Sequence, residues 1–402
     1  MSIALYSYVA SSYWKGYLPP VDTLQYRLHD TFTKNQAISL HCIDPINSNL
    51  SNYYKFTNLA ARAIYDNDFV TASSLYDSAF LFKKSPFYVD LNNYILVNNK
   101  SKLHDKNDMA IRHLMVNKKM DTTQLFIHTP KRVFNKKNLA LIDKLANEQG
   151  KIKPRVSAFE ESLREIFALD QAVRDYSSIE KKDSVSWKIL YAKRDSVDAE
   201  NFIRFAGLIA QYGFPSEETF GAVFDDSRKW DAVISVLLLH FSHVKDEKVT
   251  KRVINIILEA LYAGKLHSSL FATLLDIYDL ESGAQMSGQY NFMNTTLNLV
   301  LGEAYRPFVK YSDSLMRKIN TNRIAIGLDS FHITQKQVAC QFIGSLATEG
   351  SNLIPMVPYA SIHQLPAGFA KLSLEESNED LSSYKINASK ILDECSYQEK
   401  IY

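Results

Sequence analysis

The sequence predicts an all-α protein, and its composition and periodicity carry that prediction. The 402 residues include only 13 glycines and 11 prolines, about half the usual share of roughly 12%. Tight turns are therefore few, which disfavours a sandwich or barrel of many short strands. Apolar residues recur at helical spacing through most of the chain after residue 53. Hydrophobic residues make up 46% and charged residues 22% of the chain, as in an ordinary globular protein.

The amino-terminal region, residues 1–150, is expected to contain a helical hairpin near residues 53–82. Two apolar helical stripes follow one another there, separated by the polar break at 66–68. Small side chains would let the two helices approach closely: Ala60, Ala72 and Ala79. Aromatic side chains would fill the space between the helices: Phe56, Phe69 and Tyr76. This placement resembles one tetratricopeptide repeat, and the copies that follow it are degenerate.

A basic stretch occupies residues 100–155, with 14 Lys and Arg against 5 Asp and Glu, although the whole chain has a net charge of +2. The basic side chains are scattered through predicted helices and connections, without a Gly-rich or aromatic nucleic-acid motif. We therefore expect a solvated basic face and no nucleic acid as a partner. The segment 150–154 is the predicted linker.

A second helical domain is predicted for residues 155–320. Ser157 and Glu160 fit a capping box that begins its first helix, and Gly213 and Gly264 stand where glycines end helices. Further helices are expected at 198–212, 229–243, 246–263, 267–280 and about 295–320. Residues 321–402 are expected to add one helix, at 335–346, and a loosely ordered, proline-punctuated wrap.

Several short motifs follow one another between residues 157 and 292. In chain order they are Asp170-Gln171-x-x-Arg174, Asp198-x-x-Asn201, Tyr212-Gly213-Phe214-Pro215, Leu239-His240, Phe271-Ala272-x-Leu274-x-Asp276 and Gln285-x-x-Gly288. Their order and spacing resemble an uncharacterised bacterial helical domain-of-unknown-function family. The resemblance implies a helical fold and carries no assigned reaction. The chain departs from the family pattern at Ile277, where members often have arginine.

Asp170 is the leading candidate site residue because it falls on the apolar stripe of its helix. An inward carboxylate needs a partner, since an unpaired buried charge costs several kcal/mol or shifts the pKa upward. Arg174, one turn later, is available as that partner, and the pair has two interpretations. It is a structural ion pair that fixes helix packing, or part of a functional site in which the neighbouring Gln171 orients a ligand.

His240 and His243 lie three residues apart near the end of a predicted helix. They could bind a metal ion together with Asp276, but no zincin motif accompanies them, so no metal site is predicted. A histidine at the edge of the core is the structural alternative, and a general base oriented by Asp170 or Asp276 is the functional one. No nucleophile elbow or phosphate-binding glycine loop occurs, and no cofactor is predicted.

One polar loop, residues 282–290, is rich in glycine, glutamine and serine and includes Gln285 and Gly288. Such a loop lines a site or merely connects two helices. The candidate polar cleft therefore consists of the following residues: Asp170, Gln171, Arg174, Asn201, His240, Asp276, Gln285 and Gly288.

Two function classes follow from these observations. A helical binding or scaffold protein that recognises a peptide or protein is favoured by the repeat-like hairpin and the lack of a strong catalytic motif. A hydrolase-type enzyme or small-ligand binder that uses the polar cleft within 155–292 is the alternative.

The three cysteines are distant in sequence, and no apolar run is long enough for a transmembrane segment. We expect a cytoplasmic protein, or an exported one if the natural chain begins earlier, and the oligomeric state stays open.

Overall fold

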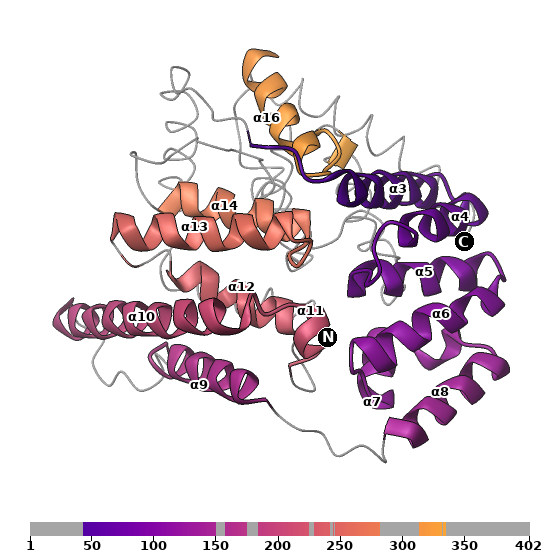
Figure 1. Ribbon diagram of the computed structural model, residues 1–402, viewed down its shortest axis with the longest axis horizontal. Coiled ribbons are helices and arrows are strands. Elements are labelled where there is room, and N and C mark those ends of the chain that lie inside the picture. The colour runs from indigo at the N-terminus through magenta and orange to yellow at the C-terminus, as the bar shows by residue number, and fades with distance from the viewer. Residues whose placement is uncertain are drawn as a thin grey trace, which may run out of the picture.

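The computed structural model of the chain describes residues 43–149, 157–174, 184–224, 229–241, 244, 246–281, 313–331 and 333–334. These residues form thirteen α-helices and a few short 3₁₀ and π turns, with no β-strand among them (Figure 1). The predicted all-α class is therefore confirmed. Within the same residues, a helix with the length and apolar character needed to cross a bilayer is not found.

The amino-terminal helices stack in chain order (Figure 1). They are α3 (Ser48–Tyr65), α4 (Phe69–Phe80), α5 (Tyr88–Lys100), α6 (Asn107–Arg112), α7 (Thr122–His128) and α8 (Lys136–Gln149). The turn between α3 and α4 forms as the polar break indicates, because Asn67 adopts a left-handed φ of 59° and the Asp68 side chain caps α4 by accepting from the Thr71 N–H. The hairpin predicted near residues 53–82 corresponds to α3 and α4, although α3 begins earlier, at Ser48. Its likeness to a tetratricopeptide repeat stays a prediction.

The second group of helices packs around α12, which contacts every other member of the group. It comprises α9 (Ala158–Ala172), α10 (Ser184–Tyr212), α11 (Glu217–Phe220), α12 (Trp230–Phe241), α13 (Glu247–Tyr262) and α14 (Ser268–Glu281). The helix expected from residue 198 begins at Ser184 instead. Within residues 188–197 no apolar side chain is fully buried, so the sequence shows no core stripe there although the helix continues.

The predicted capping box at the start of α9 forms only in part. The Ser157 side chain accepts a hydrogen bond from the Glu160 N–H at 3.1 Å. The Glu160 carboxylate pairs instead with Arg164, one turn further along, at 2.8 Å. The serine therefore caps the helix, while the glutamate stabilises its exposed side.

The last described helix, α16 (Asp313–Ala325), crosses the boundary that we expected at residue 320. It packs against the segment that leads into α3, where Asn322 Oδ1 accepts from the Ile43 N–H at 3.2 Å and Ala325 O accepts from the Ile46 N–H at 3.0 Å. The linker 150–154 and the helix and wrap expected within 335–402 lie outside the described residues.

The predicted amino-terminal and second regions share a hydrophobic core. Tyr53, Tyr54 and Phe87 from the first helices belong to the same buried cluster as Trp230 and Phe271 from the second group. A second cluster lies within the amino-terminal stack. Because one cluster includes side chains of both regions, the described helices form a continuous packed body.

Candidate functional site

Asp170 lies on the buried face of α9, as its position in the apolar stripe predicts. The stripe of Phe159, Leu163 and Ile166 points inward from the same face. The Asp170 side chain is 0% exposed. A carboxylate in such surroundings must be paired or protonated, and the structure supplies three donors.

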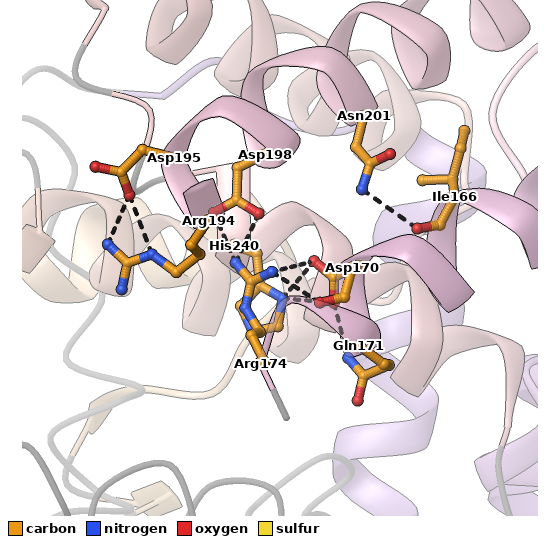
Figure 2. A network of polar contacts seen from close by, with 9 residues as sticks. All are labelled: Ile166, Asp170, Gln171, Arg174, Arg194, Asp195, Asp198, Asn201 and His240. Carbon is orange, nitrogen blue, oxygen red and sulfur yellow. Dashed lines mark hydrogen bonds and ion pairs between the residues drawn. The ribbon is translucent and has the colours of Figure 1, made fainter. Parts of the chain in front are cut away.

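Arg174 connects Asp170 to a second buried carboxylate, Asp198 on α10 (Figure 2). Its Nη1 donates to Asp170 Oδ1 at 2.9 Å, and its Nη2 donates to the two oxygens of Asp198 at 2.6 and 2.7 Å. The planar guanidinium suits this bridging arrangement, because its donors project in fixed directions. The Asp170–Arg174 ion pair expected from sequence is thus present and extends to a third residue.

His240 on α12 and Gln171 on α9 complete the shell around Asp170. His240 Nδ1 lies 2.8 and 2.9 Å from the two Asp170 oxygens, and Gln171 Nε2 donates to Oδ2 at 2.7 Å (Figure 2). A carboxylate only accepts, so the imidazole proton in this contact is assigned to Nδ1. The cluster of Asp170, Arg174, Asp198 and His240, called the buried network below, joins α9, α10 and α12.

The other predicted site residues lie in different surroundings. Asn201 on α10 donates to the Ile166 carbonyl at 3.3 Å and so links α10 to α9 without bonding to the carboxylates (Figure 2). Asp276 on α14 is buried. Burial lowers the pKa of Arg323, a buried side chain of α16, and the negative charge of Asp276 raises it. Gln285 and Gly288 lie outside the described residues.

Asp198 is the functional candidate that our sequence-based site omitted, although it occurs in a motif of the resemblance. It falls four residues before Phe202 and seven before Phe205, both buried on the same face of α10. The criterion that identified Asp170, an acidic residue on an apolar stripe, would have identified Asp198 as well.

A second polar cluster lies where the amino-terminal helices meet α11, and we did not predict it. The Lys118 side chain, 1% exposed, places Nζ 3.0 Å from Glu217 Oε2 and donates to Ser85 Oγ at 3.1 Å. Glu217 Oε2 also accepts the Tyr88 N–H at 2.7 Å. These four residues, called the junction cluster below, join two groups of helices that are about a hundred residues apart in sequence.

Backbone contacts reinforce this junction. The Lys118 carbonyl accepts the Ala222 N–H at 2.8 Å. Gly221 adopts a φ of +91°, and a Cβ at that position would lie 2.4 Å from the same carbonyl oxygen. Only glycine fits both the left-handed backbone and the close approach.

Asp90 and Lys83 adjoin the junction cluster and have perturbed pKa values. Burial raises the pKa of Asp90 to about 7, against the opposing effect of the hydrogen bond from the Tyr53 hydroxyl. Burial lowers the pKa of Lys83 to about 8; its Nζ donates to the Gly264 carbonyl at 2.7 Å and lies 4.4 Å from the Phe87 ring centroid. Such shifts occur at functional sites and in structural ion-pair networks alike.

His267 is held neutral beside these groups. Burial lowers its pKa to about 3, and the nearby charge of Lys83 acts in the same direction. Its Nδ1 accepts the Ser269 N–H at 3.1 Å, and its ring packs edge-on against Tyr54 and Phe87. A neutral imidazole therefore forms part of the aromatic core here.

Across the described part of the chain, no group of three or more histidine, cysteine or acidic side chains is arranged to hold a metal ion. Comparison with known proteins adds no relative: no family model, curated protein or solved structure matches the chain. The interpretation of both clusters therefore rests on their geometry.

Proposed function

We propose that the chain is a helical scaffold that binds a protein or peptide partner. The observation that carries this proposal is the internal satisfaction of the buried network. Asp170 and Asp198 are 0% exposed, and Arg174 bonds to both of them. A carboxylate surrounded by protein donors at helix–helix contacts holds helices in place. This supports a structural role for Asp170 and Arg174 of the candidate polar cleft.

The exposed basic face of the amino-terminal stack suggests the chemistry of the partner. Lys131, Arg132 and Lys136 are exposed, and the neighbouring Ile127 is 46% exposed. Neither Lys131 nor Arg132 forms an ion pair with another described residue. A partner segment that combines acidic and apolar side chains would complement this surface through charge and apolar contact.

The proposal is tested by fluorescence anisotropy with a labelled amphipathic peptide of glutamate and leucine, about 15 residues long. Lys131→Glu combined with Arg132→Glu should weaken binding about tenfold or more. The matched control is Arg317→Glu with Lys318→Glu, an adjacent Arg–Lys pair exposed on α16. Both double variants should keep the wild-type melting temperature.

The result that overturns the proposal is equal binding by both double variants, or no binding by the wild type. A DNA oligonucleotide of matched charge provides a second comparison. If it binds as tightly as the peptide, the surface recognises polyanions in general, and the assignment of a protein partner fails.

The hydrolase alternative retains one specific supporting observation, the contact between His240 Nδ1 and the Asp170 carboxylate. A carboxylate that accepts from Nδ1 fixes the tautomer in which Nε2 can act as a base. A panel of p-nitrophenyl esters and phosphates tests this candidate. Turnover that is lost in His240→Gln but kept in His113→Gln would favour it, and absence of turnover by the wild type would exclude hydrolysis of these two substrate classes.

A further inference from the structure

The outer face of α10 carries a heptad-spaced stripe that no other described helix covers. Side chains spaced alternately by three and four residues lie on one side of a helix. Seven exposed positions follow this spacing: Ile189, Lys193, Ser196, Glu200, Ile203, Gly207 and Ala210. The opposite side of α10 is buried through Asp198, Phe202 and Phe205.

The exposure of two isoleucines on this stripe is high. Ile189 is 66% and Ile203 is 70% exposed. A Cβ added at Gly207 would have no neighbouring atom within 4 Å, so the space beyond the helix is open there as well. Two large β-branched side chains in water on one face of a 29-residue helix are a feature of surfaces that pack against another protein.

We infer that this face of α10 packs against the same face of a second copy of the chain, with the two helices antiparallel. In such a pair, a two-fold axis crosses the helices beside Ser196. Ile189 and Ile203 lie seven residues on either side of Ser196, or about 10.5 Å at 1.5 Å per residue. The axis therefore places Ile189 of each copy opposite Ile203 of the other.

The charged residues of the stripe favour a second copy of the chain as the partner and an antiparallel direction of its helix. Lys193 and Glu200 lie three and four residues on either side of Ser196, so the same axis brings each lysine close to the glutamate of the other copy. Both are exposed, and neither is ion-paired with a described residue. A parallel arrangement would place lysine against lysine and glutamate against glutamate, which is unfavourable.

The size of the contact indicates a weak dimer. The stripe from Ile189 to Ile203 is about 21 Å long, and one helix pair of that length buries less than the roughly 1,200 Å² of a standard stable interface. Association should therefore depend on concentration in the micromolar to millimolar range. Ser196 at the axis is small enough to allow the two backbones to approach closely.

Sedimentation equilibrium of the full chain, from about 1 µM to about 1 mM, tests the inference. The wild type should form dimers, and Ile203→Asp should weaken association tenfold or more. The matched control is Ile324→Asp, at an isoleucine on α16 that is 63% exposed, and it should associate like the wild type. A wild type that stays monomeric at the highest concentration, or equal association by the two variants, overturns the inference.

Charge reversal gives a test that does not remove apolar surface. Lys193→Glu and Glu200→Lys should each weaken the dimer about fivefold or more. Each single change places like charges at residues 193 and 200 of opposite copies, and the two-fold axis repeats this repulsion. The double variant restores opposite charges and should recover the wild-type association within about twofold. If the double variant associates no better than the single ones, the antiparallel pairing is wrong.

Crosslinking tests the position of the axis. Under mild oxidation, Ser196→Cys should form a disulfide-linked dimer faster than Ser74→Cys, an exposed serine on α4, or the wild type with its native cysteines. An equal rate in all three proteins contradicts an axis beside residue 196.

Discussion

Arg174 Nη2 lies 2.6 Å from Asp198 Oδ2, across 24 residues of chain, while Nη1 of the same guanidinium holds Asp170. One arginine thus ties the end of α9 to the middle of α10. His240 adds α12 through its contact with Asp170. The position of three helices is consequently coupled through one buried charge network.

Asp198→Asn should lower the free energy of unfolding by about 3–5 kcal/mol, because it removes one partner of a buried ion pair and leaves the guanidinium undercompensated. Chemical denaturation followed by circular dichroism measures the change. The matched control is Glu165→Gln, which breaks the more exposed Arg204–Glu165 pair at 2.8 Å and should cost less than about 1 kcal/mol. Equal small losses for the two variants would contradict a structural role for the network.

Lys118→Met should also destabilise the fold by about 3–5 kcal/mol, because Glu217 would remain buried without its cation. The paired change Lys118→Met with Glu217→Gln should cost clearly less than the sum of the single changes. A double-mutant cycle in urea measures this coupling. Strict additivity would mean that the contact between Lys118 and Glu217 does not hold the junction cluster together.

Gly221→Ala should destabilise the protein by several kcal/mol, because the backbone φ is +91° and the new methyl group would meet the Lys118 carbonyl at 2.4 Å. Gly207→Ala is the control and should stabilise α10 by about 0.5–1 kcal/mol, since helical glycine is unfavourable and nothing lies within 4 Å of the new Cβ. Thermal unfolding at low protein concentration measures the change in stability of each variant. A similar response of both variants would show that the close approach at residue 221 is unimportant.

Asp90 should make the stability of the folded chain depend on pH. Its folded pKa of about 7 exceeds the unfolded value of about 3.9. The folded state therefore keeps a proton that the unfolded chain releases, and this stabilising contribution, complete below about pH 4, is lost as the pH rises to 7. As the pH rises across this range, the free energy of unfolding of Asp90→Asn should increase relative to that of the wild type by up to about 1.4 kcal/mol per pH unit.

His267 provides the control of opposite sign. Its folded pKa of about 3 lies below the unfolded value of about 6.5, so stability is lost as the pH falls below 6.5. Relative to the wild type, His267→Gln should therefore gain stability as the pH falls. Unfolding curves between pH 4 and 8 measure both differences, and parallel pH profiles for the two variants would contradict the assigned burial of these groups.

Much of the fold could be predicted because helix formation depends on near neighbours. The spacing of apolar residues located α3, α4, α12, α13 and α14 to within a few residues, and the polar break at 66–68 marked the first turn. The same periodicity identified Asp170 as an inward carboxylate, and Arg174 as its partner followed from a separation of one helical turn. The first half of α10 was not predicted, because its residues 188–197 include no fully buried apolar side chain.

The sequence by itself therefore determined the helical class, the first hairpin and the ion pair within one turn of α9. The tertiary structure decided that Asp198 and His240 close around that pair, that Lys118 meets Glu217, and that α16 packs against the segment before α3. These contacts join residues from 24 to 279 positions apart. Such residues meet only when the packing of several helices sets their directions and distances, whereas a contact within one helical turn is fixed by the geometry of the helix alone.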